Sequence, residues 1–210
     1  MTMEAKSLIF DIDGTLWDST AIVARGYNDY LAEIGHRELS VTPSQLKKLF
    51  GRTMTEIADL LFPQFPEEAR YAMMGGCMDR EHVFLEADPC DVAYPGVVRT
   101  LKRLAENHDL YIVSNSQKGY PALLIQKLGI ETLIRGHLCY GDTGASKGKT
   151  IRTLMERSGS GAAAYRGDTQ GDLEATREAG IPFVFCRYGF GNPEHWDAVI
   201  DSFEELTGIF

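Results

Sequence analysis

The chain has 210 residues, of which 44% are hydrophobic and 24% charged, and its formal net charge is −9. The acidic balance disfavours nucleic acid and anionic membranes as partners, and no apolar run approaches the roughly 18 residues that span a bilayer. We therefore expect a cytoplasmic globular protein with one large domain, or with a core domain that carries a smaller insert.

The first predicted element is a strand at 6–10, a short apolar run that ends in polar residues. Residues 17–91 contain no convincing strand, and apolar residues recur there at helical spacing. A long helical stretch runs from 67 to about 86, and Gly75-Gly76 in its middle favours a kink. We interpret 17–91 as an all-helical insert, whose seven basic and thirteen acidic residues give a net charge of −6.

Strands and helices alternate in the remainder of the chain. The predicted strands occupy 110–113, 133–140 (the weakest), 162–166 and 182–186. The predicted helices occupy 96–107, 120–128, 147–158 and 172–179. This alternation is typical of βαβ units and predicts an open, doubly wound α/β domain with a mainly parallel sheet. The domain would comprise 1–16 and 92–210.

The strongest chemical signal is the D-I-D-G-T motif of residues 11–15, directly after the first strand. Ligands of open parallel sheets bind at the carboxyl ends of the strands, so Asp11 and Asp13 would both face the site. One acid can act as a nucleophile held against a metal, and the other as a proton donor and acceptor. A solvated acidic turn is the alternative. An EF-hand calcium loop is disfavoured, because it needs a glutamate at its twelfth position, where Ile22 stands.

Three later segments add polar groups at the ends of predicted elements. Ser114-Asn115-Ser116 offers a hydroxyl and backbone N–H groups to phosphate oxygens, although such residues are also common in turns. Lys147 opens a helix, where its cation opposes the helix dipole, so an anionic partner would explain it better than helix stability. An ordinary surface lysine is the alternative. Asp168 follows the 162–166 strand and can complete with Asp11 an oxygen-ligand site of the kind Mg²⁺ prefers.

These four segments, in this order, resemble the four motifs of the haloacid dehalogenase superfamily of hydrolases. The resemblance spans 11–191, and the insert lies where members similar to phosphoglycolate phosphatase carry a helical cap. It implies a Rossmann-like core and a Mg²⁺-dependent phosphatase that hydrolyses a small phosphorylated metabolite, such as phosphoglycolate or a sugar phosphate, through an aspartyl-phosphate.

The resemblance also implies a role for each motif residue. Asp11 would attack phosphorus, and Asp13 would protonate the leaving oxygen and later activate water. The phosphoryl group would be bound by Thr15, Ser114, Asn115 and Lys147. Mg²⁺ would be held by Asp11, the main-chain carbonyl of Asp13 and Asp168, with support from Asp172.

Two positions depart from the family's pattern. The family commonly has a proline after its lysine, whereas Gly148 follows Lys147 here and Lys149 is close by. We assign the catalytic role to Lys147. Arg166 stands in a strand where apolar residues are usual, and we expect it to reach solvent or to pair with an acid.

Other functions share these core residues. A phosphomutase similar to β-phosphoglucomutase is the alternative within the enzyme class, and a catalytically silent binding module is the alternative outside it. A dehalogenase is disfavoured because Asp13 supplies an acid/base that carbon–halogen cleavage does not need. Arg52, in a break between helices of the insert, is a candidate contact for a substrate anion, or simply an exposed turn residue. We expect a monomer or homodimer.

Overall fold

The computed structural model describes residues 3–210. They divide into two compact units, one formed by residues up to 18 together with 93–210, and the other by 19–92. The sequence pattern places these borders after residues 16 and 91. In the structure the borders lie after residues 18 and 92, so Trp17 and Asp18 fall in the first unit and Val92 falls in the helical one.

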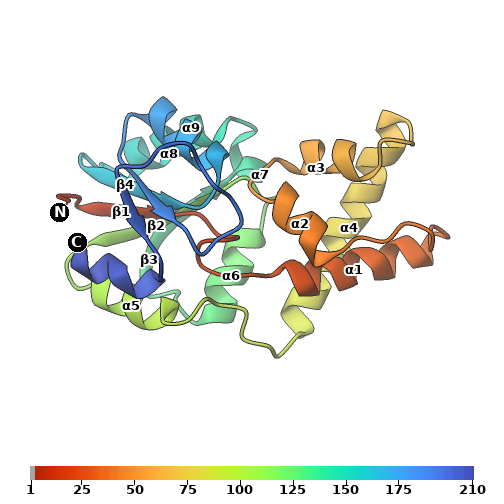
Figure 1. The fold of residues 1–210 in the computed structure, drawn as a ribbon, viewed down its shortest axis with the longest axis horizontal. Helices are drawn as coiled ribbons and strands as arrows, with labels where there is room; N and C mark the ends of the chain where they lie inside the picture. The colour runs from red at the N-terminus through yellow and green to blue at the C-terminus, as the bar shows by residue number, and fades with distance from the viewer. Residues whose placement is uncertain (1–2) are drawn as a thin grey trace. The chain divides into compact units, whose positions relative to one another are not determined.

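A six-stranded parallel sheet forms the centre of the first unit, in the order β3-β2-β1-β4-β5-β6 (Figure 1). The strands are β1 (Ser7–Phe10), β2 (Asp109–Ser114), β3 (Ile134–Cys139), β4 (Ala163–Gly167), β5 (Phe183–Cys186) and β6 (Ala198–Ile200). This is the order of doubly wound sheets, and its direction of winding reverses between β1 and β4. The predicted class, an α/β fold with a mainly parallel sheet, is confirmed, and β6 is an addition to the prediction.

Helices cover both faces of this sheet. They are α5 (Val97–Leu104), α6 (Tyr120–Leu128), α7 (Tyr140–Thr143), α8 (Lys147–Ser158), α9 (Gln170–Ala179) and the 3₁₀ helix η1 (Phe203–Gly208). Figure 1 shows α8 and α9 on one face and α5 on the other. On the α8/α9 face, Ile9 and Tyr165 join Ile151 and Leu173 in one buried apolar cluster. Alternate strand residues such as Phe10 point to the opposite face, because side chains of a strand alternate.

Arg166 of β4 does not reach solvent and pairs with no acid in the described part of the chain, so both sequence expectations are wrong. Its side chain is fully buried, and its guanidinium carbon lies 5.4 Å from the ring centroid of Phe10 and 4.1 Å from that of Phe210. Its Nη1 donates to the carbonyl of Ala164, whereas Nε and Nη2 have no hydrogen-bond partner among the described residues. Burial lowers the pKa of Arg166 to about 9.

The regular elements of unit 19–92 are helices. They are α1 (Thr20–Glu33), α2 (Pro43–Leu49), α3 (Met54–Leu61) and α4 (Glu67–Ala87). The helix α4 continues through Gly75 and Gly76, the pair at which the sequence favours a kink. Gly76 has a packing role: a Cβ atom there would lie 1.9 Å from the ring of Tyr30 on α1. Of the helices described, none combines the length and apolarity that crossing a membrane would require.

Candidate active site

The candidate site lies at the carboxyl ends of β1, β2 and β4, where the winding of the sheet reverses. Asp11 directly follows β1, Ser114 ends β2, and Asp168 directly follows β4. β1 pairs with both of the other strands, so these three residues come from adjacent strands. Backbone pairing continues past β1, since the N–H of Asp11 donates to the carbonyl of Arg166 at 2.8 Å. The sheet therefore fixes the position of Asp11.

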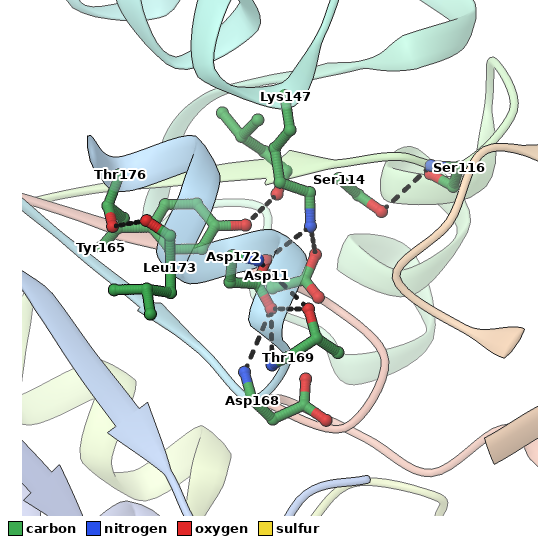
Figure 2. A network of polar contacts seen from close by, with 11 residues as sticks. Asp11, Ser114, Ser116, Lys147, Tyr165, Asp168, Thr169, Asp172, Leu173 and Thr176 are labelled. Atoms are coloured by element: carbon green, nitrogen blue, oxygen red, sulfur yellow. Dashed lines mark hydrogen bonds and ion pairs between the residues drawn. The ribbon is translucent and has the colours of Figure 1, made fainter. Parts of the chain in front are cut away.

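A buried lysine joins two carboxylates at the centre of the site (Figure 2). Lys147 Nζ lies 3.0 Å from Asp11 Oδ1 and 2.7 Å from Asp172 Oδ1, and all three side chains are almost completely buried. Lys149, two residues on, is exposed. The structure therefore brings Lys147 together with Asp11, and Lys149 faces solvent.

The start of α8 positions Lys147. Ser146 is the N-cap, and its hydroxyl accepts from Lys149 N at 3.4 Å and donates to the carboxylate of Glu178 on α9 at 2.8 Å. A Cβ atom on Gly148 would lie 2.4 Å from that carboxylate. Glycine thus follows Lys147 because α9 approaches the helix start closely.

Asp172 is held by a helix cap as well as by the lysine. It is the third residue of α9 in a capping box with Thr169. Its Oδ2 accepts from Thr169 N at 3.0 Å, from Thr169 Oγ1 at 2.7 Å and from Asp168 N at 3.2 Å, while Oδ1 accepts from Lys147. With both oxygens engaged by donors, Asp172 is suited to hold Lys147 and the β4–α9 loop in place.

Asp168 carries an unsatisfied buried oxygen. Its Oδ2 accepts from Phe190 N at 2.6 Å, but Oδ1 is buried without a hydrogen-bond partner among the described residues. Gly14 allows the D-I-D-G-T loop to approach: its φ is +80°, and a Cβ atom there would lie 2.2 Å from the Asp168 carboxylate. One oxygen each from Asp11, Asp168 and Asp172 lies within 4.8 Å of the others, a grouping able to hold a metal ion.

The charge balance of this cluster calls for a cation. Three buried carboxylates face one ammonium group, which leaves two negative charges if all are ionised. Burial raises the pKa of Asp11 to about 7 and raises that of Asp168 well above its ordinary value. Burial alone would also raise the pKa of Asp172, but the charge of Lys147 and the hydrogen bonds from Lys147 and Thr169 together outweigh burial and lower that pKa. An oxygen-liganded divalent cation fits the unsatisfied Asp168 oxygen and the excess charge.

Asp13 lies at the edge of the cluster and is partly exposed. Its Oδ1 accepts from the indole Nε1 of Trp17 and from the hydroxyl of Tyr120, each at 2.9 Å. Neither donor is predictable from the motif alone, and Tyr120 is 107 residues away in the chain.

The hydroxyl groups of the site are largely buried. Ser114 is 6% exposed, and its oxygen accepts from Ser116 N at 3.2 Å. The hydroxyl oxygens of Thr15 and Ser116 are buried and have no hydrogen-bond partner within the described part of the chain. Asn115 is partly buried beside Ser114. The sequence indicates Ser116 as part of a segment that could bind phosphate oxygens or form a turn, and the burial of its hydroxyl is a feature that only the structure shows.

Two further residues support the site from the segment after β5. The Tyr188 hydroxyl donates to the carbonyl of Thr15 at 2.8 Å, and Phe190 N–H is the donor to Asp168. Both belong to the Y-G-F-G run of residues 188–191. Arg52, by contrast, belongs to the helical unit, where it is exposed in the bend between α2 and α3.

Comparison with known proteins gives a consistent result. The family model of haloacid dehalogenase-like hydrolases matches residues 8–186. A phosphoglycolate phosphatase of Agrobacterium fabrum is 27% identical, over 95% of this chain and 89% of the relative. One of Xanthomonas campestris is 28% identical, over 92% and 90% of the two chains.

Solved structures agree on the fold. A crystal structure of a predicted phosphoglycolate phosphatase from Haemophilus somnus has a TM-score of 0.84 at 21% identity, and covers 100% of this chain and 99% of its own. The resemblance seen in the four motifs and the expectation of a hydrolase are therefore confirmed. The chain belongs to the haloacid dehalogenase-like hydrolase family.

Proposed function

We propose that this hydrolase is a Mg²⁺-dependent phosphatase that transfers the phosphoryl group of a small metabolite to Asp11 and then to water. The observation that carries the proposal is the buried pairing of Asp11 with Lys147, next to an unsatisfied Asp168 oxygen. A silent binding module would not need to bury three carboxylates against one lysine, because each buried charge opposes folding unless it is compensated.

The metal would be held by Asp11, the main-chain carbonyl of Asp13 and Asp168, with Asp172 supporting them through the loop. When bound, Mg²⁺ supplies positive charge that offsets the negative charge of the transferring phosphoryl group. Asp172 accepts hydrogen bonds at both oxygens, which fits this supporting position.

In the first step, a carboxylate oxygen of Asp11 attacks phosphorus and the bond from phosphorus to the leaving oxygen breaks. Asp13 gives its proton to that oxygen, which departs as an alcohol. Lys147 holds Asp11 in place and offsets negative charge as the group transfers. The hydroxyl of Ser114 and the backbone of Asn115 would bind the phosphoryl oxygens, with the Thr15 hydroxyl in support.

In the second step, Asp13 takes a proton from water, and the oxygen of that water attacks the phosphorus of the aspartyl-phosphate. The bond between Asp11 and phosphorus breaks, so inorganic phosphate leaves and Asp11 is restored. Asp13 thus acts first as acid and then as base, and it is again protonated for the next turnover.

A small substrate is the best-supported class. The curated relatives are named phosphoglycolate phosphatases, so phosphoglycolate is the first candidate for this chain. Unit 19–92 has seven basic and twelve acidic residues, a balance that does not favour large polyanions. Within it, Arg52 remains our candidate contact for a substrate anion.

Phosphate release from a panel of phosphorylated metabolites and an aryl phosphate tests the proposal, with Mg²⁺ and with excess EDTA. We expect Mg²⁺-dependent release that is abolished by Asp11→Asn. The phosphomutase alternative predicts instead that a phosphoryl group moves between hydroxyls of a sugar phosphate with little free phosphate. Full turnover in EDTA, or no release from any ester, would contradict the proposal.

A further inference from the structure

Two aromatic side chains that lie outside the motifs of the site donate hydrogen bonds to Asp13. Trp17 Nε1 and the Tyr120 hydroxyl both donate to Asp13 Oδ1 at 2.9 Å, and the two rings meet edge to face with centroids 5.7 Å apart. Trp17 is fully buried and Tyr120 is 2% exposed, so bulk water does not compete for these two hydrogen bonds.

The two donors are positioned by separate segments of the backbone. Trp17 lies on the loop after β1, where its carbonyl accepts from Gly14 N at 2.9 Å and its backbone bridges to Ala93. Tyr120 is the first residue of α6, which follows Gly119 at a φ of +92°. The Asp13 carboxylate is therefore fixed from two directions by well-anchored backbone.

We propose that Trp17 and Tyr120 are positioning residues for proton transfer by Asp13. Because both hydrogen bonds fall on Oδ1, they set the rotation of the carboxylate and direct Oδ2 toward the reacting oxygen. The inference rests on the proposed function, in which Asp13 is the acid and base. A phenylalanine would fill the Tyr120 site equally well, so packing alone does not call for the hydroxyl.

Tyr120→Phe tests the role with little change in volume. We expect kcat for an alkyl phosphate to fall about 10- to 100-fold with KM nearly unchanged, because a misplaced acid fails mainly in the transition state. With an aryl phosphate, whose leaving group needs little protonation, the initial burst should stay near the wild-type rate, and only the later hydrolysis should slow. Trp17→Phe should show the same pattern, with folding checked by thermal unfolding.

Two comparisons separate positioning from a general structural effect. Tyr111→Phe, at another mostly buried tyrosine outside the site, should leave both steps unchanged. In an Asp13→Asn background, Tyr120→Phe should cause no further loss, because its effect passes through Asp13.

The inference is overturned if Tyr120→Phe matches or exceeds the wild-type rate, if it slows both steps equally, or if its effect persists without Asp13. Wild-type protein that hydrolyses no phosphate ester overturns the proposed function, and this inference with it.

Discussion

Replacing Lys147 by alanine is the substitution whose effect follows most directly from the geometry. The change removes the ammonium group that lies 3.0 Å from Asp11 and 2.7 Å from Asp172, in a place with almost no solvent. Loss of one preorganised charge-stabilising group lowers kcat by about 10²–10³. We expect at least this loss for Lys147→Ala, because the same group also orients the nucleophile.

The substitution should also destabilise the metal-free protein. Removing one partner of a buried ion pair costs about 3–5 kcal/mol, since it leaves a buried charge uncompensated. Lys149→Ala is the matched control, because Lys149 is exposed on the same helix and such surface changes usually stay within about 0.5 kcal/mol.

Phosphate release at saturating Mg²⁺ measures the catalytic effect, and denaturant unfolding with and without Mg²⁺ measures stability. Circular dichroism would check that each variant retains the fold. If Lys149→Ala is the damaging change, or if Lys147→Ala keeps near-normal kcat, the assignment of the catalytic lysine is wrong.

Three further predictions concern stability and metal binding. Gly75→Ala should raise the free energy of unfolding by about 0.5–1 kcal/mol, whereas Gly76→Ala should lower it by about 1–3 kcal/mol, because only a Cβ atom at position 76 meets Tyr30. Denaturant unfolding measures both variants, and equal effects would contradict the packing described. Arg166→Met should raise the free energy of unfolding by about 1 kcal/mol or more, since two buried guanidinium nitrogens, Nε and Nη2, have no hydrogen-bond partner among the described residues; a clear loss of stability would show that the ring contacts outweigh this cost. Burial raises the pKa of Asp11 to about 7, so protons should compete with Mg²⁺ for this carboxylate below that pH. Calorimetry should show that Mg²⁺ binding releases protons below pH 7 and that the affinity for Mg²⁺ rises as the pH increases toward 7. An affinity that does not change with pH would refute this.

Most of the sheet could be predicted from the sequence, because strands such as β1, β2 and β5 are mainly apolar runs followed by polar residues. β6 has only three residues and η1 is a short 3₁₀ segment, so neither produces a periodic signal long enough to recognise. The packing role of Gly76 in α4 could not be predicted for a different reason. Local propensity favours a kink there, but the contact of Gly76 with Tyr30 depends on tertiary packing.

The same limit applies to the site. The motif carboxylates and Lys147 can be placed from sequence, because strand ends and helix starts converge at the carboxyl edge of a parallel sheet. The donor from Tyr120 to Asp13 cannot, since no local pattern joins residues 107 apart. Trp17 is only four residues from Asp13, but its hydrogen bond to that carboxylate is not predictable from the motif alone. The surroundings of Arg166 could not be predicted from the sequence either, because the aromatic rings beside it belong to Phe10 and Phe210, which are far from it in the chain.

The covalent step is the centre of the account, and rapid quenching tests it most directly. Asp13→Asn removes acid and base assistance, each typically worth about 10²–10⁴ in rate, but keeps the main-chain carbonyl at position 13. With an aryl phosphate the first step should proceed while hydrolysis stalls. Mass spectrometry of the quenched variant should then show one added phosphoryl group on the peptide that contains Asp11, and none in Asp11→Asn. A phosphoryl group on another residue, or near-normal turnover of Asp13→Asn, would contradict the mechanism.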